Sequence, residues 1–82
     1  MQSNHISINL AFSAVLREVR NSKKISQNEL AELADLDRTY ISLLERGLRG
    51  PSLTTLIDLA VGLGVEQIVL LNMVQSHRNK DS

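Results

Sequence analysis

The sequence predicts an all-α fold of five helices. Aromatic residues make up only 2% of its 82 residues, while leucine and isoleucine are frequent, and this balance favours helices over sheets. Apolar residues recur at intervals of three and four in several segments, as they do on one face of a helix. The length predicts a single domain, 1–82, with an ordered core over about 8–75 and a polar, frayed tail over 76–82.

The first helix is expected over about Asn9 to Asn21. Its apolar residues follow the i, i+3, i+4, i+7 pattern of an amphipathic helix: Phe12, Val15, Leu16 and Val19. The second helix is expected to begin after Ser26. Ser26 and Glu29 have the spacing of a capping box, in which each side chain bonds the backbone N–H of the other residue. The apolar stripe of this helix is expected at Leu30, Leu33 and Ala34.

The third helix is expected within the stretch "DRTYISLLERG", which begins at the N-cap residue Asp37 and ends at Gly47. Ile41 and Leu44 are spaced to share its inner face. The other face carries hydrogen-bonding side chains: Arg38, Thr39, Ser42 and Arg46. Only about three residues, 35–37, separate the second and third helices. Two helices on so short a turn cross steeply, as in a helix-turn-helix.

The fourth helix is expected over Leu53 to Leu63, capped by Ser52 and ended by Gly64 in the left-handed conformation. Its buried face is expected at Leu53, Leu56, Ile57 and Ala60.

The fifth helix, over about Glu66 to Gln75, is apolar around its whole circumference. Such a helix must be buried on two sides. We expect a second copy of the chain on one side, with Ile68 facing the monomer core and a dimer interface drawn from Leu70, Leu71 and Val74. The alternative is a helix buried deep in its own core.

The sequence gives no support for catalysis, a metal site or a cofactor. It has no cysteine, no HExxH motif and no phosphate loop, and the two histidines, His5 and His77, stand near the expected frayed ends. No signal peptide or long apolar run is present, which predicts a cytoplasmic protein with no membrane partner. The formal net charge is zero and argues against a nucleic-acid partner, but a neutral total can hide a basic face.

Taken together, the motifs resemble the Xre/Cro-like, or lambda repressor-like, helix-turn-helix family over roughly 12–71. The markers are Ser26-Gln27, Glu29-Leu30-Ala31, Tyr40-Ile41-Ser42, Glu45-Arg46-Gly47, Pro51-Ser52-Leu53 and Leu63-Gly64-Val65. The resemblance implies a five-helix domain whose second and third helices form the helix-turn-helix. The short length and "DLDRTYISLLERG" are similar to restriction-modification controller proteins, although the same string also occurs in uncharacterised bacterial regulators.

One position departs from the family pattern. The family usually has glycine in the turn where this chain has Asp35. A turn glycine there adopts a positive φ, and aspartate is among the few other residues that tolerate that region. We therefore expect the turn to survive at a modest cost.

The resemblance and the residue pattern together predict a double-stranded DNA interface. The N-terminal residues of a recognition helix meet base edges in the major groove. The expected base contacts are Arg38, Thr39, Ser42 and Gln27, with Gln27 open to a phosphate contact instead. The expected backbone contacts are Tyr40, Arg46, Arg49 and Ser52. The resemblance also implies a structural ion pair between Arg20 and Glu45.

The leading interpretation is a homodimeric, sequence-specific transcription regulator that occupies a pseudo-palindromic operator and blocks or recruits RNA polymerase. No small-molecule ligand is expected, and the sequence does not separate an activator from a repressor. The alternative is a protein-binding module of the same fold, such as an antitoxin component. The neutral net charge keeps that alternative open.

Overall fold

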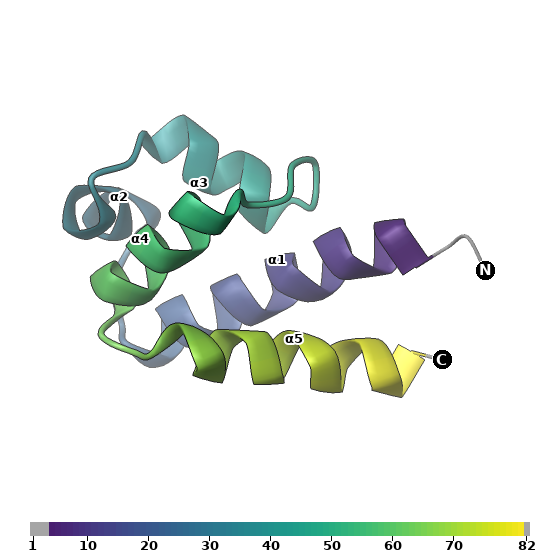
Figure 1. The fold of residues 1–82 in the computed structure, drawn as a ribbon. Helices are drawn as coiled ribbons and strands as arrows, with labels where there is room; N and C mark the ends of the chain where they lie inside the picture. Colours follow the sequence, from purple (N-terminus) through teal and green to yellow (C-terminus); the bar gives the residue numbers. More distant parts are fainter. Residues whose placement is uncertain (1–3, 82) are drawn as a thin grey trace.

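The computed structural model describes residues 4–81, with side chains over 8–79. This part of the chain forms five α-helices and no strand: α1 Asn4–Ser22, α2 Gln27–Ala34, α3 Arg38–Glu45, α4 Leu53–Leu63 and α5 Gln67–Asp81 (Figure 1). The all-α prediction is confirmed, and so is the assignment of the short turn to the segment between α2 and α3.

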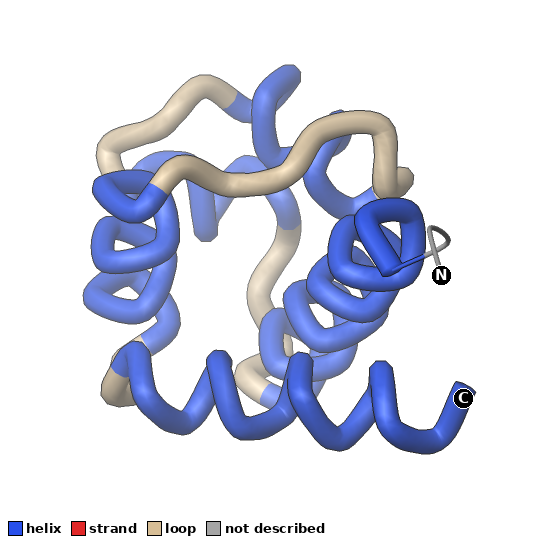
Figure 2. The backbone as a smooth tube through the Cα atoms, turned by 45° about the vertical axis from the view of Figure 1, so that its right-hand side comes forward, coloured by secondary structure: helices blue, strands red, loops and turns tan. Residues whose placement is uncertain are grey.

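The two long helices, α1 and α5, pack against each other and run in opposite directions, so that the chain ends lie on the same side of the molecule (Figures 1 and 2). The three shorter helices lie to the other side of α1, where α2 packs on both α3 and α4. Helices α2 and α4 approach closely at Gly62. A Cβ atom added to Gly62 would lie 3.0 Å from the backbone nitrogen of Ala34.

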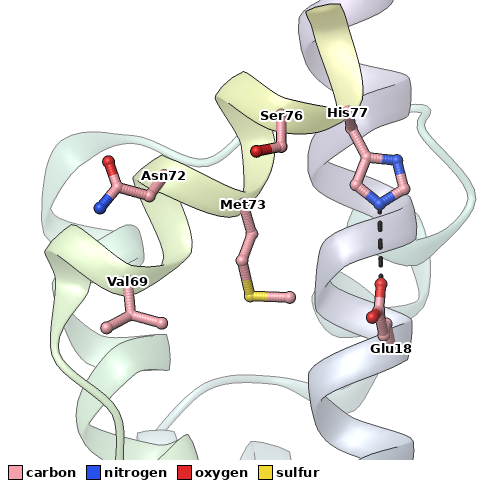
Figure 3. Close-up of a pocket in the computed structure, with 6 residues that line it drawn as sticks. All are labelled: Glu18, Val69, Asn72, Met73, Ser76 and His77. Atoms are coloured by element: carbon pink, nitrogen blue, oxygen red, sulfur yellow. Dashed lines mark ion pairs between the residues drawn. The ribbon is translucent and has the colours of Figure 1, made fainter. Parts of the chain in front are cut away.

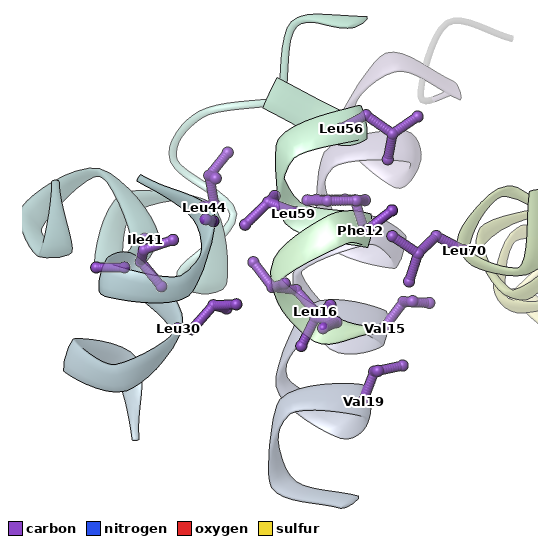
Figure 4. Close-up of a cluster of buried hydrophobic side chains, with 14 residues drawn as sticks. Phe12, Val15, Leu16, Val19, Leu30, Ile41, Leu44, Leu56, Leu59 and Leu70 are labelled. Atoms are coloured by element: carbon purple, nitrogen blue, oxygen red, sulfur yellow. The ribbon is translucent and has the colours of Figure 1, made fainter. Parts of the chain in front are cut away.

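One apolar core joins all five helices (Figure 4). Its fully buried side chains come from every helix: Val15 and Leu16, Leu30, Ile41 and Leu44, Leu59, and Leu70. The core therefore holds the helix-turn-helix in place through α1 and α4, and it anchors α5 through Leu70.

The helix ends follow the local chemistry of the sequence. Ser26 and Glu29 form the capping box, with Ser26 Oγ accepting from the Glu29 N–H at 3.0 Å. Asp35 adopts the left-handed conformation, φ 57° and ψ 47°, and Gly64 does the same at the end of α4. These predictions are confirmed.

Both long helices extend beyond their expected ends. Helix α1 begins at Asn4 instead of Asn9, and α5 continues to Asp81 instead of ending near Gln75. Residues 76–81, which the sequence analysis expects in a polar tail, thus lie within a helix, because α5 continues alongside α1. His77 lies within α5 with its Nε2 atom 3.6 Å from Glu18 Oε1, whereas the side chain of His5 lies outside the described residues.

Three leucine and isoleucine side chains expected in the core are exposed instead: Leu33 at 58%, Leu53 at 74% and Ile57 at 42%. In helix α4, Leu56 and Ala60 are buried as expected, but Leu59 and Leu63 complete the inner face in place of Leu53 and Ile57. Because this helix is apolar over most of its circumference, its sequence pattern alone could not select the inner face.

The burial expected for Ile68 and Leu70 is reversed. Leu70 has no exposed surface and points from α5 toward Phe12 and Val15 (Figure 4), whereas Ile68 is 53% exposed. Leu70 is therefore a core residue and is unavailable to a second copy of the chain. Leu71, 47% exposed, and the partly buried Val74 remain at the surface or its edge.

No single helix within residues 4–81 is long and apolar enough to cross a membrane. Helix α4 and Gln67–Asn79 meet that criterion only as a pair, and they are bent by 108°.

Candidate nucleic-acid interface

The turn between α2 and α3 sets the direction of α3. The left-handed Asp35 reverses the chain, and the next N–H, that of Leu36, donates back to the Ala31 carbonyl at 2.8 Å. Asp37 then caps α3 by accepting from the Thr39 N–H at 2.9 Å. Arg38 is consequently the first residue of α3.

Helix α3 has one buried and one accessible face. Ile41 and Leu44 are fully buried, which fixes the helix against the core. Arg38 and Thr39 are exposed on the opposite side and Ser42 is half-buried there. We call Arg38, Thr39 and Ser42 the reading face, after the base contacts that the sequence analysis expects of them; all three lie on the accessible side of α3.

The expected ion pair between Arg20 and Glu45 is present, with Glu45 buried and Arg20 partly buried. Arg20 Nε lies 2.6 Å from Glu45 Oε2, and Arg20 Nη2 donates to Glu45 Oε1 at 3.0 Å. The hydrogen bond to Glu45 raises the pKa of Arg20, and burial opposes that shift. Arg20 also donates to the Ile25 carbonyl at 2.8 Å, and Arg17 donates to the backbone carbonyl of Glu45. Helix α1 thus clamps the end of α3.

Gln27 joins this ion pair to the reading face. Its Nε2 atom donates to Glu45 Oε1 at 3.0 Å, and its Oε1 atom accepts from Arg38 Nη1 at 3.4 Å. Among the described residues, no buried side-chain nitrogen or oxygen lacks a partner. Sequence reasoning missed these two bonds, since their partners are 18 and 11 positions apart and only the packing of α2 on α3 brings them together.

The residues expected to contact the DNA backbone fall into two places. Tyr40, Arg49 and Ser52 meet near the start of α4. Tyr40 donates to Thr55 Oγ1 at 3.4 Å, and the Arg49 guanidinium lies 5.6 Å from the centre of the Tyr40 ring. Ser52 caps α4 by accepting from the Thr55 N–H at 3.0 Å. Arg46 stands apart and exposed at the end of α3.

An apolar surface covers much of α4 and α5. We define the α4–α5 apolar face by its exposed side chains: Leu53, Ile57, Val61, Ile68 and Leu71. Leu53 and Leu71 also line one groove of about 260 Å³, together with Val74 and with Ile8 and Phe12 of α1. This groove connects the exposed side chains of α4 and α5 at Leu53 and Leu71.

A second, more polar pocket of about 340 Å³ lies between α1 and α5, where Glu18 and His77 face each other (Figure 3). Its other lining residues are Val69, Asn72, Met73 and Ser76. In the described part of the chain, no group of three histidine, aspartate or glutamate side chains could hold a metal ion.

The turn between α2 and α3, with one face of α3 buried and the other accessible, defines a helix-turn-helix domain. A helix-turn-helix family model (HTH_3) matches residues 16–66, and the chain belongs to that family. The Xre/Cro-like resemblance is thereby confirmed.

Several of the similar proteins are control proteins, and others are HTH-type transcriptional regulators. The chain is 43% identical to the control protein C.BamHI of Bacillus amyloliquefaciens over 67 residues, 80% of this chain and 83% of that protein. It is 45% identical to the control protein C.SmaI of Serratia marcescens over 56 residues, 68% of this chain and 67% of that protein.

Solved structures of controller proteins have a similar fold. The restriction-modification controller protein C.AhdI from Aeromonas hydrophila is 42% identical, with a TM-score of 0.73, over 76% of this chain and 94% of that one. The controller protein C.Esp1396I, solved as a tetramer in complex with its natural 35 base-pair operator, is 32% identical, with a TM-score of 0.82, over 88% and 95%.

Proposed function

We propose that this protein is a sequence-specific, double-stranded DNA-binding transcription regulator, and more specifically a restriction-modification controller protein. The observation that carries the proposal is the accessible face of α3, which begins with Arg38 and is backed by a fully buried face. The similarity to C.Esp1396I, solved on its natural operator, supports the same function. Such a regulator needs no catalytic group and acts in the cytoplasm, where it blocks or recruits RNA polymerase.

Sequence reading is assigned to the reading face. A major groove admits one α-helix, and an arginine fork matches guanine O6 and N7. Arg38 is the guanine reader, while Thr39 and Ser42 bond a base edge or, for Thr39, touch a thymine methyl. Gln27 borders this face through its bond to Arg38.

Binding to the DNA backbone is assigned to Tyr40, Arg46, Arg49 and Ser52. Phosphate contacts fix the register without reading sequence. The two arginines bring positive charge to the start and the middle of the loop that follows α3. Ser52 marks the N-terminus of α4, and free N–H groups at such a terminus favour a phosphate.

The active form is a homodimer on a pseudo-palindromic operator. A second copy of the chain would cover Val74 and the α4–α5 apolar face, including Leu71, which is otherwise exposed to water. Two reading faces would then meet half-sites about one helical turn, or 10 base pairs, apart.

Selection of bound DNA from a random pool, followed by titration at several salt concentrations, tests this function. A pseudo-palindromic consensus and a steep linear fall of log K with log salt are expected. Sedimentation should give a dimer. A gene for a methyltransferase beside one for an endonuclease near this gene would support the controller assignment.

The second candidate is a protein-binding module, such as an antitoxin component, which the zero net charge keeps open. A flat salt dependence and no enriched DNA sequence would replace the DNA proposal with this one.

A further inference from the structure

The carboxylate of Glu45 fixes which way the Gln27 amide points. An ionised carboxylate only accepts hydrogen bonds, so the Gln27 group that faces it must be the NH₂. Glu45 is itself held by Arg20 through two bonds and is only 3% exposed. The amide therefore has one orientation, with its Nε2 toward the buried ion pair and its Oε1 toward Arg38.

In this orientation, the Gln27 amide occupies one nitrogen of the Arg38 guanidinium. Gln27 Oε1 accepts from Nη1, which leaves the Nε–Nη2 edge for the paired donors that guanine O6 and N7 require. Arg38 is otherwise an exposed, rotamer-rich side chain, which must be immobilised when it binds a base. A bond made before the DNA arrives reduces that cost.

The same bonds argue against Gln27 as a base reader. A glutamine reads adenine with both ends of its amide, accepting from N6 and donating to N7. Both ends of the Gln27 amide are already engaged within the protein. To read a base, Gln27 would have to leave Glu45 and give up a bond to a buried carboxylate.

We propose that Gln27 is a positioning residue that orients Arg38 for guanine, with the buried Arg20–Glu45 pair as its anchor. The proposal rests on the DNA-binding function proposed above. It assigns guanine discrimination to a series of bonded side chains. The series runs from Arg20 on α1 to Glu45 at the end of α3, then to Gln27 at the start of α2 and finally to Arg38.

The test is a double-mutant cycle with Gln27→Met and Arg38→Ala. Methionine keeps the length of glutamine but removes both hydrogen bonds. Alone, Gln27→Met should weaken operator binding about threefold to tenfold per half-site, the effect of freeing one side chain that binding must immobilise. In the Arg38→Ala background it should change affinity less than about twofold, since the residue it positions is gone.

The matched control is Asn28→Met, an exposed neighbour on α2 that takes no part in these bonds. It should leave unchanged the ratio of affinities for the operator and for the operator mutated at the guanine, whereas Gln27→Met should lower that ratio. An equal loss from Gln27→Met in both Arg38 backgrounds would overturn the proposal and make Gln27 a direct DNA contact.

A measurement without DNA separates this inference from the function it rests on. The NMR order parameter of the Arg38 Nε–H bond in the free protein should fall in Gln27→Met and stay unchanged in Asn28→Met. An unchanged Arg38 in Gln27→Met would refute positioning. If the parent binds no DNA sequence while Arg38 does loosen, the DNA-binding function fails and the positioning contact stands.

Discussion

The reading face of α3 and the α4–α5 apolar face are both accessible, but they are held in different ways. The first is surrounded by directional bonds: a capping aspartate, a buried ion pair and an amide that links the pair to Arg38. The second is held from beneath by Leu70 and its core neighbours, and its outer side chains meet water. A surface that must recognise a fixed pattern of donors and acceptors needs fixed geometry. An apolar surface that only has to be covered by another copy of the chain does not need such fixed geometry.

Two adjacent leucines on α5 give the sharpest contrast between burial and display. Leu70 is fully buried and Leu71 is 47% exposed. Leu70→Ala should lower the free energy of unfolding by about 2–5 kcal/mol, since it removes a fully packed side chain and leaves a cavity. Denaturant unfolding measures this change in free energy. A loss below about 1 kcal/mol, less than a buried leucine normally contributes, would mean that Leu70 is not part of the core.

Leu71→Glu is the companion change and should affect association instead. The new carboxylate would lie in the middle of the proposed dimer interface, where an unpaired charge is costly to bury. We expect sedimentation to give a monomer and operator affinity to fall by at least about tenfold, or 1.4 kcal/mol, with unfolding nearly unchanged apart from the loss of dimer. A dimer as tight as the parent's would remove this surface from the interface.

The buried ion pair should contribute more than the surface pair on the same helix. Glu45→Ala leaves Arg20 without its carboxylate and should lower the free energy of unfolding by about 1–3 kcal/mol. Glu18→Ala, which removes the exposed partner of His77, is the control and should cost about 0–1 kcal/mol. Thermal melting of both variants measures the two losses of stability. If Glu45→Ala loses no more stability than Glu18→Ala, the Arg20–Glu45 pair contributes no more than a surface contact.

Reading and holding should separate in two arginine variants. Arg38→Ala should cost about 1–3 kcal/mol per half-site on the operator, roughly double for a dimer, and much less on a site mutated at its guanine. Arg46→Ala should weaken binding to all sequences and reduce the salt slope by about one unit for each phosphate that is no longer neutralised. The measurement is a titration of both variants against operator and scrambled DNA. Equal losses of affinity on both DNAs for Arg38→Ala would make Arg38 a backbone-binding residue and pass base reading to Thr39 or Ser42.

The sequence predicts best what is decided locally. Capping at Ser26, the end of α4 at Gly64 and the buried face of α3 depend on residues within a few positions, and the structure contains all of them. It fails where a helix is apolar all round: nothing in α4 or α5 alone tells Ile57 from Leu59, or Ile68 from Leu70. The two hydrogen bonds of the Gln27 amide could not be predicted from the sequence either, because they depend on how α2 and α3 pack and not on the local sequence of either helix.

The turn that joins α2 and α3 offers the smallest and most local test. Asp35 has φ 57° and Lys24, after α1, has φ 60°, and both are left-handed positions without glycine. Left-handed backbone costs an ordinary L-residue about 1–2 kcal/mol, whereas glycine loses about 0.5–1 kcal/mol through its greater freedom when unfolded. Aspartate tolerates the region better than lysine does.

Asp35→Gly should therefore raise the free energy of unfolding by only about 0–1 kcal/mol, and Lys24→Gly should gain at least as much. Part of the gain at position 35 comes from removing a negative charge at the C-terminus of α2, where the helix dipole disfavours it, so the Asp35→Gly gain should shrink at high salt. Denaturant unfolding of both variants at low and high salt measures these effects. A loss of stability in Asp35→Gly would show that the carboxylate makes a favourable contact in the turn, and the departure from the family's glycine would then be a gain for this chain instead of a tolerated cost.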